Sequence, residues 1–293
     1  VQTCYQILHI DLIQCNGVNI CQCIRLALDP YGLGRDIHMD KLKRGETAQF
    51  FALLRQHIGA EKPDFGNGDS PLSLLYEVYN ELIAFAKKYD ILLLHDNAYS
   101  DIIFDGVKGG SFLQYDGAVD VGAEFFSLSK SFDVTGARMS FLIGRPDVVA
   151  AFRKLRSQID FGVFLPIQKA AIAALTGPTD MVEQQCRDYQ ARRDALCAGL
   201  RAIGWNVLDS KGSMFVWAPV PPAYRDAYIQ SHGSDEGLSM AFCLDLIERA
   251  GVITTPGGSF GPLGEGYTRF ALVLPPEKIK EAVRSIADSG ILK

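Results

Sequence analysis

The chain has 293 residues, of which 48% are apolar and 22% are charged, and its formal net charge is −5. This length and composition predict one large or two ordinary globular domains with a sizeable core. The acidic balance argues against nucleic acid or an anionic membrane as the main partner, and no apolar run reaches the roughly 18–20 residues of a membrane span. We therefore expect a cytoplasmic protein that acts on small molecules.

Residues 1–40 are irregular, without clear periodicity, and hold four of the seven cysteines, Cys4, Cys15, Cys21 and Cys23. The odd cysteine number and the size of the chain predict reduced thiols and no disulfide framework. A zinc cluster with His9 is the alternative, but zinc sites usually contain C-x2-4-C pairs, whereas the close pair here is C-x-C. We expect no metal site and assign no function to this segment.

Residues 72–179 alternate helix and strand patterns, which predicts a mostly parallel sheet covered by helices. Apolar residues at helical spacing predict a helix over 74–89, and a proline in the first turn favours a second helix over 146–157. Apolar runs predict strands at 91–94, 124–128 and 141–144.

A long amphipathic helix is expected over 180–203, ending at Gly204, and it marks a boundary to a smaller α+β domain over 180–293. This domain should contain strands at 205–208, 213–218 and 269–273 and helices at 240–250 and 276–289. The glycine-rich stretch 256–266 is either a flexible turn or a loop that covers a substrate.

The segment 127–138 combines one lysine with hydroxyls, a glycine and an arginine, in the order SLSKSFDVTGAR. Lys130 could form an imine with the aldehyde of pyridoxal 5'-phosphate, and the freed amine could then move a proton. Ser127, Ser129 and Arg138 could bind the phosphate, with Gly136 relieving crowding at the turn. As an isolated residue, Lys130 would more simply be a surface lysine.

Asp96 and Tyr99 lie just after the predicted strand 91–94, in the stretch HDNAYSD. The carboxyl end of a buried strand is where ligands collect in open α/β sheets, and a carboxylate there could pair with the protonated ring nitrogen of the cofactor. Tyr99 could donate a hydrogen bond to the phenolic oxygen of the ring. Considered singly, Asp96 could equally be a loop residue or a helix-capping residue, and Tyr99 could be a half-buried aromatic.

Arg269 follows the glycine-rich stretch and is a candidate for binding the α-carboxylate of a substrate, because a guanidinium forks onto a carboxylate. The alternative is an arginine at a strand edge paired with Glu265 or Glu277.

These motifs resemble the class I/II aminotransferases, which are fold-type I enzymes that use pyridoxal phosphate. The likeness runs from Leu74 to the C-terminus, and HDNAYSDIIFDG (95–106) and FGPLGEGYTRFALV (260–273) look most like the branch with LL-diaminopimelate, alanine and aspartate aminotransferases. The resemblance implies a three-layer α/β/α large domain and a homodimer. It gives Lys130, Asp96 and Tyr99 the catalytic and ring contacts, Ser127, Ser129 and Arg138 the phosphate, and Arg269 the substrate carboxylate.

The sequence departs from the family before Leu74. The family's N-P-T-G turn is absent, and the corresponding window reads FGNGDSP (65–71), so we do not assign the role of its asparagine to Asn67. Residues 41–71 look like the family's N-terminal arm, joined almost directly to the second half of the cofactor domain. We therefore expect an incomplete large domain with uncovered apolar faces.

The expected activity is transfer of an amino group between an amino acid and a 2-oxo acid. A carbon–sulfur β-lyase reaction with the same cofactor is one alternative, and a catalytically impaired homologue that acts only by association is another. A cofactor-sensing regulator is disfavoured, because residues 1–40 have neither a helix-turn-helix pattern nor basic character.

Overall fold

The computed structural model describes residues 6–10, 24–26, 71–106, 110–160 and 162–292. These residues form two compact units. The first contains the described residues up to 101 together with 110–160 and 162–181, and the second contains 102–106 and 182–292. The arm-like segment up to residue 70, Asn67 and Cys4, Cys15, Cys21 and Cys23 lie outside the described residues, and the side chain of His9 does as well. None of the helices in the described parts is long and apolar enough to cross a membrane.

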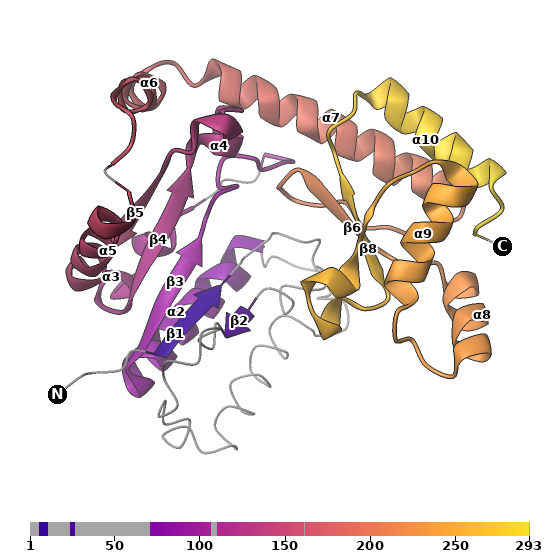
Figure 1. Cartoon of the computed structure of the whole chain (residues 1–293), viewed down its shortest axis with the longest axis horizontal. Coiled ribbons are helices and arrows are strands. Elements are labelled where there is room, and N and C mark those ends of the chain that lie inside the picture. Colours follow the sequence, from indigo (N-terminus) through magenta and orange to yellow (C-terminus); the bar gives the residue numbers. More distant parts are fainter. Residues whose placement is uncertain (1–5, 11–23, 27–70, 107–109, 161, 293) are drawn as a thin grey trace. The chain divides into compact units, whose positions relative to one another are not determined.

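The first unit is built on a five-stranded sheet with the order β2-β1-β3-β4-β5 (Figure 1). Its strands are β1 (Gln6–Ile10), β2 (Ile24–Leu26), β3 (Ile91–Asp96), β4 (Gly122–Ser127) and β5 (Ser140–Gly144). The central pairs β1–β3 and β3–β4 are parallel, and the outer pairs β1–β2 and β4–β5 are antiparallel.

The predicted α/β fold is confirmed, with a sheet whose central pairs are parallel, and the prediction needs correction only at the two outer pairs, which are antiparallel. Between β4 and β5 the chain has only the helical turn α4 (Leu128–Ser131) and the 3-10 turn η4 (Thr135–Ala137). These short turns form no crossover helix over the face of the sheet, and the chain turns back along β4. The prediction that residues 1–40 are irregular is also wrong where β1 and β2 pair with the sheet.

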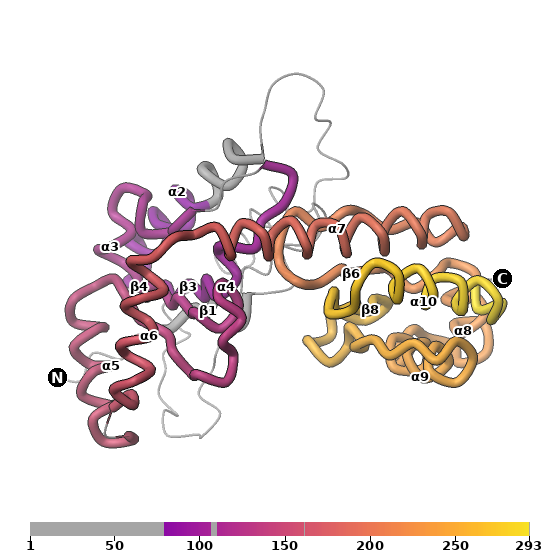
Figure 2. Tube along the Cα trace, turned by 90° about the horizontal axis from the view of Figure 1, so that it is seen from above, coloured from indigo at the N-terminus to yellow at the C-terminus, as the bar shows by residue number. Residues whose placement is uncertain are grey.

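Helices cover both faces of this sheet. Figure 2 shows α2 (Pro71–Tyr89) and α3 (Ala118–Val121) on one face and α5 (Pro146–Ile159) on the other. Helix α2 buries Leu82, Ile83 and Ala86, at the spacing expected for one face of a helix, and Asp90 ends it in the left-handed conformation with φ 54°. Helix α6 (Leu165–Thr176) was not predicted from the sequence.

Helices α5 and α6 carry a group of exposed apolar side chains. Every residue of α5 is at least partly exposed, and α6 buries only Ala171. The large apolar side chains that are more than half exposed here are Leu155, Ile159, Phe164, Leu165, Ile172 and Leu175.

The second unit is an α+β unit around an antiparallel sheet with the order β6-β8-β7. Its strands are β6 (Phe215–Pro219), β7 (Thr255–Pro256) and β8 (Tyr267–Ala271), and its helices are α7 (Asp180–Ala202), α8 (Pro222–His232), α9 (Leu238–Ala250) and α10 (Pro276–Asp288). Trp205 packs edge-on against Phe242 and Phe270 in the core.

One prediction fails in this unit. Residues 205–208 form no strand, because Trp205 donates its backbone N–H to Leu200 O at 2.9 Å and its indole N–H to Pro219 O at 2.8 Å. Helix α8 was not predicted from the sequence, although it begins at Pro222 and proline is well suited to the first turn of a helix.

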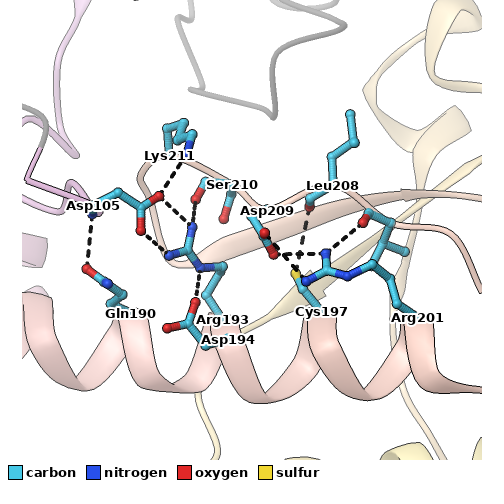
Figure 3. Close-up of polar contacts among 11 residues, drawn as sticks. Asp105, Gln190, Arg193, Asp194, Cys197, Arg201, Leu208, Asp209, Ser210 and Lys211 are labelled. Atoms are coloured by element: carbon cyan, nitrogen blue, oxygen red, sulfur yellow. Dashed lines mark hydrogen bonds and ion pairs between the residues drawn. The ribbon is translucent and has the colours of Figure 1, made fainter.

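A buried arginine of α7 fastens residues 102–106 to the second unit (Figure 3). The side chain of Arg193 is 2% exposed and binds the Asp105 carboxylate through two hydrogen bonds of 2.6 and 3.1 Å. It also donates to Ser210 O at 2.5 Å and to Asp194 at 2.6 Å, while Lys211 reaches Asp105 at 2.9 Å. The chain immediately after the HDNAYSD stretch is thus held by a charged network.

Candidate functional site

Asp96 is the last residue of β3, at the edge of the sheet where the parallel strands β3 and β4 both end (Figure 1). It pairs in register with Phe125, two residues before the end of β4. Its half-buried carboxylate accepts the Ala98 backbone N–H at 3.2 Å, which orients the side chain over the turn that follows. The structure thus brings Asp96 to the same sheet edge as the lysine segment.

Lys130 lies on the helical turn α4, which begins directly after β4. Ser127 caps this turn, because its hydroxyl accepts the Ser129 N–H at 3.1 Å. The amine of Lys130 donates to Thr135 Oγ1 at 3.5 Å, and Thr135 in turn donates to Ser129 O at 3.1 Å. Thr135 therefore orients the lysine, a role that the sequence interpretation missed.

Arg138 is exposed and adopts the left-handed conformation with φ 53°, and its guanidinium donates to Thr135 O at 3.2 Å. The predicted need for Gly136 is wrong for this chain. A Cβ at Gly136 would meet nothing within 4 Å, and the residues at positive φ around it are Asp133 and Arg138. The turn therefore does not need glycine at position 136 to avoid a steric clash.

Tyr99 lies in the turn after Asp96 and is half-buried. It is the third residue after the end of β3, so its ring and the Asp96 carboxylate belong to the same short segment of the first unit. This arrangement gives one carboxylate and one phenol within a single turn.

Arg269 belongs to the second unit, where it lies on the central strand β8. The alternative of a strand-edge arginine is therefore wrong. Its guanidinium lies over two rings, at 4.1 Å from the centre of Phe215 and 4.5 Å from that of Phe260. Stacking of this kind fixes the plane of the guanidinium fork.

The glycine-rich stretch is folded tightly on itself through η5 (Gly257–Phe260) and η6 (Pro262–Gly264). A Cβ on Gly257 would lie 2.1 Å from Gly264 O, so only glycine allows this approach. Glu265 accepts the Ser239 backbone N–H at 2.5 Å and so ties the loop to the start of α9.

A fully buried carboxylate, Glu124 of β4, is the main feature that the sequence interpretation missed. It accepts hydrogen bonds from Asn97 and Ser111, and its Oε1 is 3.1 Å from His95 Nδ1. Burial alone would raise the pKa of this carboxyl, but the bonds from His95, Ser111 and Asn97 outweigh burial and hold the pKa below its usual range. Glu124 is therefore ionised at neutral pH.

The donor set at the sheet edge fits pyridoxal phosphate in its chemistry. A carboxylate (Asp96) suits a protonated ring nitrogen, a phenol (Tyr99) suits the ring oxygen, and an amine (Lys130) suits the aldehyde carbon. The hydroxyls and the guanidinium between 127 and 138 suit a phosphate. Among the described residues, no group of His, Cys, Asp or Glu is arranged to hold a metal ion.

Comparison with known proteins places these residues in a wider context. The family model for aminotransferase class I and II matches residues 76–286. LL-diaminopimelate aminotransferase from Halothermothrix orenii is 43% identical over 215 residues, which cover 73% of this chain and 52% of that protein. Glutamate-pyruvate aminotransferase AlaC from Escherichia coli is 41% identical over 248 residues, which cover 82% and 58%.

A solved structure of a probable N-succinyldiaminopimelate aminotransferase from Thermus thermophilus superposes with a TM-score of 0.65 at 30% identity, covering 73% of this chain and 54% of that one. The chain spans about half the length of the curated relatives it matches. The family model covers most of the chain and includes both the lysine turn and β8. The chain therefore belongs to the class I and II aminotransferases, a family of pyridoxal phosphate-dependent enzymes of fold type I.

Proposed function

We propose that this chain moves an amino group between an amino acid and a 2-oxo acid, with pyridoxal phosphate bound at the carboxyl edge of the first unit's sheet. The observation that carries the proposal is the placement of Asp96 and Lys130 at the ends of two adjacent parallel strands. Neighbouring strands are about 4.8 Å apart, so one ring could reach both groups. The names of the relatives make LL-diaminopimelate, glutamate and alanine the first substrates to test.

When bound, pyridoxal phosphate supplies an electron-withdrawing ring that stabilises negative charge at the substrate carbon. Asp96 would keep the proton on the ring nitrogen, and Tyr99 would donate a hydrogen bond to the ring oxygen. Ser127, Ser129 and Arg138 would bind the phosphate. Lys130 Nζ would hold the cofactor in the resting protein and, once released, would take the proton from the substrate carbon and return it to the cofactor.

Arg269 would bind the α-carboxylate of the substrate. Phe215 and Phe260 support this role, because they hold the plane of the guanidinium in place. A fixed donor loses little entropy on binding, which favours affinity for a carboxylate.

We also propose that the chain forms a homodimer in the cytoplasm. The family typically builds dimers, and the exposed apolar side chains of α5 and α6 support a contact with a second copy. The described cysteines, Cys186, Cys197 and Cys243, are free thiols, which agrees with a reducing compartment. Light scattering of the purified chain should give twice the monomer mass, and a monomer at micromolar concentration would argue against the dimer.

The central test is a titration with pyridoxal phosphate, following visible absorption beside a Lys130→Ala control. We expect a band in the unmodified chain that needs Lys130 and bleaches when an amino acid is added. A band that survives the substitution, or no band at all, would refute the proposal. Release of pyruvate and ammonia without a 2-oxo acid acceptor would instead indicate the lyase reaction.

A further inference from the structure

Glu124 is an unusual residue for the interior of this sheet. Its side chain is 0% exposed, and the contacts that satisfy it come from uncharged donors and one histidine. Taking a carboxylate out of water costs several kcal/mol, so it persists only where donors converge on it. A structural role alone would be met more cheaply by an apolar residue of similar size.

Two of the groups that contact Glu124 flank the candidate ring partner. His95 and Asn97 are the residues immediately before and after Asp96, and Glu124 stands in register with His95. His95 Nδ1 lies 3.1 Å from the carboxylate, and Asn97 Nδ2 donates to it at 2.5 Å. Side chains alternate along a strand, so these two point to one face and Asp96 points to the other.

Further contacts immobilise both flanking residues. Asn97 also donates to Gly110 O at 3.1 Å, and its backbone N–H extends the β3–β4 ladder to Phe125 O at 2.9 Å. His95 is buried, with Nε2 3.4 Å from the Tyr79 hydroxyl and its ring edge-on to Phe112. Burial and the nearby Glu124 charge raise the pKa of Tyr79, so this phenol stays neutral.

We propose that Glu124 is a positioning residue, which fixes the direction of the Asp96 carboxylate by holding His95 and Asn97 from the opposite face of β3. The use of Asp96 for the cofactor ring rests on the proposed function. Asp96 takes its direction from the backbone on each side, and both sides are held by the same buried carboxylate. Without the contacts from Glu124 to His95 and Asn97, the Asp96 carboxylate would lose the alignment that a contact to the ring nitrogen needs.

The first arm of the test needs no cofactor. Glu124→Gln keeps the shape but turns an amide N–H₂ toward groups that donate, so hydrogen exchange in the peptide 95–100 should accelerate at least tenfold. Asp120→Asn is the matched control, because it also neutralises a carboxylate of the first unit but at a 70% exposed side chain. Equal exchange in this peptide for Glu124→Gln and the control would overturn the proposal.

The second arm measures the dissociation constant for pyridoxal phosphate by visible absorption. Loss of an outer partner costs metal sites about 10- to 100-fold in affinity, and we expect a rise of about tenfold here. Asn97→Ala should give a similar or smaller rise. Glu124→Gln already loses the contact to Asn97 as well as the contact to His95, so the double variant should bind the cofactor no more weakly than Glu124→Gln alone. If Glu124→Gln fails to fold, Asn97→Ala tests the proposal in its place, because Asn97 is a half-buried residue in a loop.

Hydrogen exchange and cofactor affinity together distinguish failure of the positioning role from failure of the proposed function. If the unmodified chain shows no Lys130-dependent band, the proposed function fails, while exchange in 95–100 still decides whether Glu124 holds Asp96. If exchange accelerates but cofactor affinity matches that of Asp120→Asn, Glu124 is a structural residue and the positioning role is refuted. Additive losses in the double variant would likewise show that Glu124 does not act through Asn97.

Discussion

Removing the guanidinium of Arg193 should destabilise the second unit by about 2–3 kcal/mol. Breaking a buried ion pair typically costs about 3–5 kcal/mol when the remaining charge is stranded. Here the Asp105 side chain is 31% exposed and keeps Lys211 at 2.9 Å, so that cost is reduced. The Ser210 carbonyl oxygen, however, loses its donor, which adds about 1–3 kcal/mol, and the methionine in Arg193→Met recovers part of the packing.

The assay is urea unfolding followed by tryptophan fluorescence. Both tryptophans, Trp205 and Trp217, belong to the second unit, so the signal reports that unit. With a typical slope of about 1–3 kcal/mol/M, Arg193→Met should lower the midpoint by about 1–2 M urea.

Arg187→Met is the matched control on the same helix, where the side chain is 62% exposed and its Glu183 partner is 3.9 Å away. We expect that variant to stay within about 0.5 kcal/mol of the unmodified chain. Arg193→Lys keeps the charge but loses the fork, so its midpoint should lie between the two. Equal midpoints for Arg193→Met and Arg187→Met would show that the contacts of Arg193 do not stabilise the second unit.

Three further predictions concern pH, backbone packing and thiol reactivity. Hydrogen bonds from Arg193 lower the pKa of Asp105 to about 2, below the usual value of about 3.9. The ionised carboxylate therefore stabilises the folded unit above pH 4, and this stabilisation disappears as the pH falls toward 2. The stability difference between the chain and Asp105→Asn, about 1 kcal/mol after solvent screening, should therefore be constant above pH 5 and shrink below pH 4 in acid unfolding curves. Gly257→Ala should lower the melting temperature measured by circular dichroism, at a cost of about 1–3 kcal/mol, whereas Gly136→Ala should leave it unchanged; equal shifts would contradict the close approach. Burial raises the pKa of the Cys197 thiol to about 12, so mass spectrometry after alkylation at pH 8 should find Cys186 modified before Cys197. Modification of Cys197 as early as Cys186 would show that Cys197 is not buried.

The sequence predicted those elements whose pattern is local. Helix α2 was recognisable because its apolar residues recur at the period of a helix, and strand β3 because it is a continuous apolar run. Helix α9 was also predicted from the sequence. The direction of β5 and the pairing of β1 with β3 were not, since both depend on contacts between distant segments. Local patterns carry no information on such pairings.

The candidate site shows the same division. Asp96 and Lys130 could be placed at one edge because each follows a predicted strand, and parallel strands end together. Glu124 resembled an ordinary polar residue in a strand, and only folding brings donors from 95, 97 and 111 onto it. The one signal available was a glutamate within an otherwise apolar strand, since a charge in that place needs partners.

Glu124 and Arg193 are both buried charged side chains within the part of the chain that the structure describes, but they are satisfied in different ways, and this difference separates fold from function. Arg193 is paired with carboxylates that remain partly in water, so its loss should appear mainly as a loss of stability in the second unit. Glu124 is satisfied by a histidine, an amide and a hydroxyl at the edge where Asp96 and Lys130 lie, in the first unit. Glutamine at that position removes the charge without opening a cavity, so its main effect should fall on the direction of Asp96 and on cofactor affinity, with no change in the tryptophan signal of the second unit. A variant that lowered cofactor affinity and left that signal intact would therefore locate the cofactor contact in the first unit.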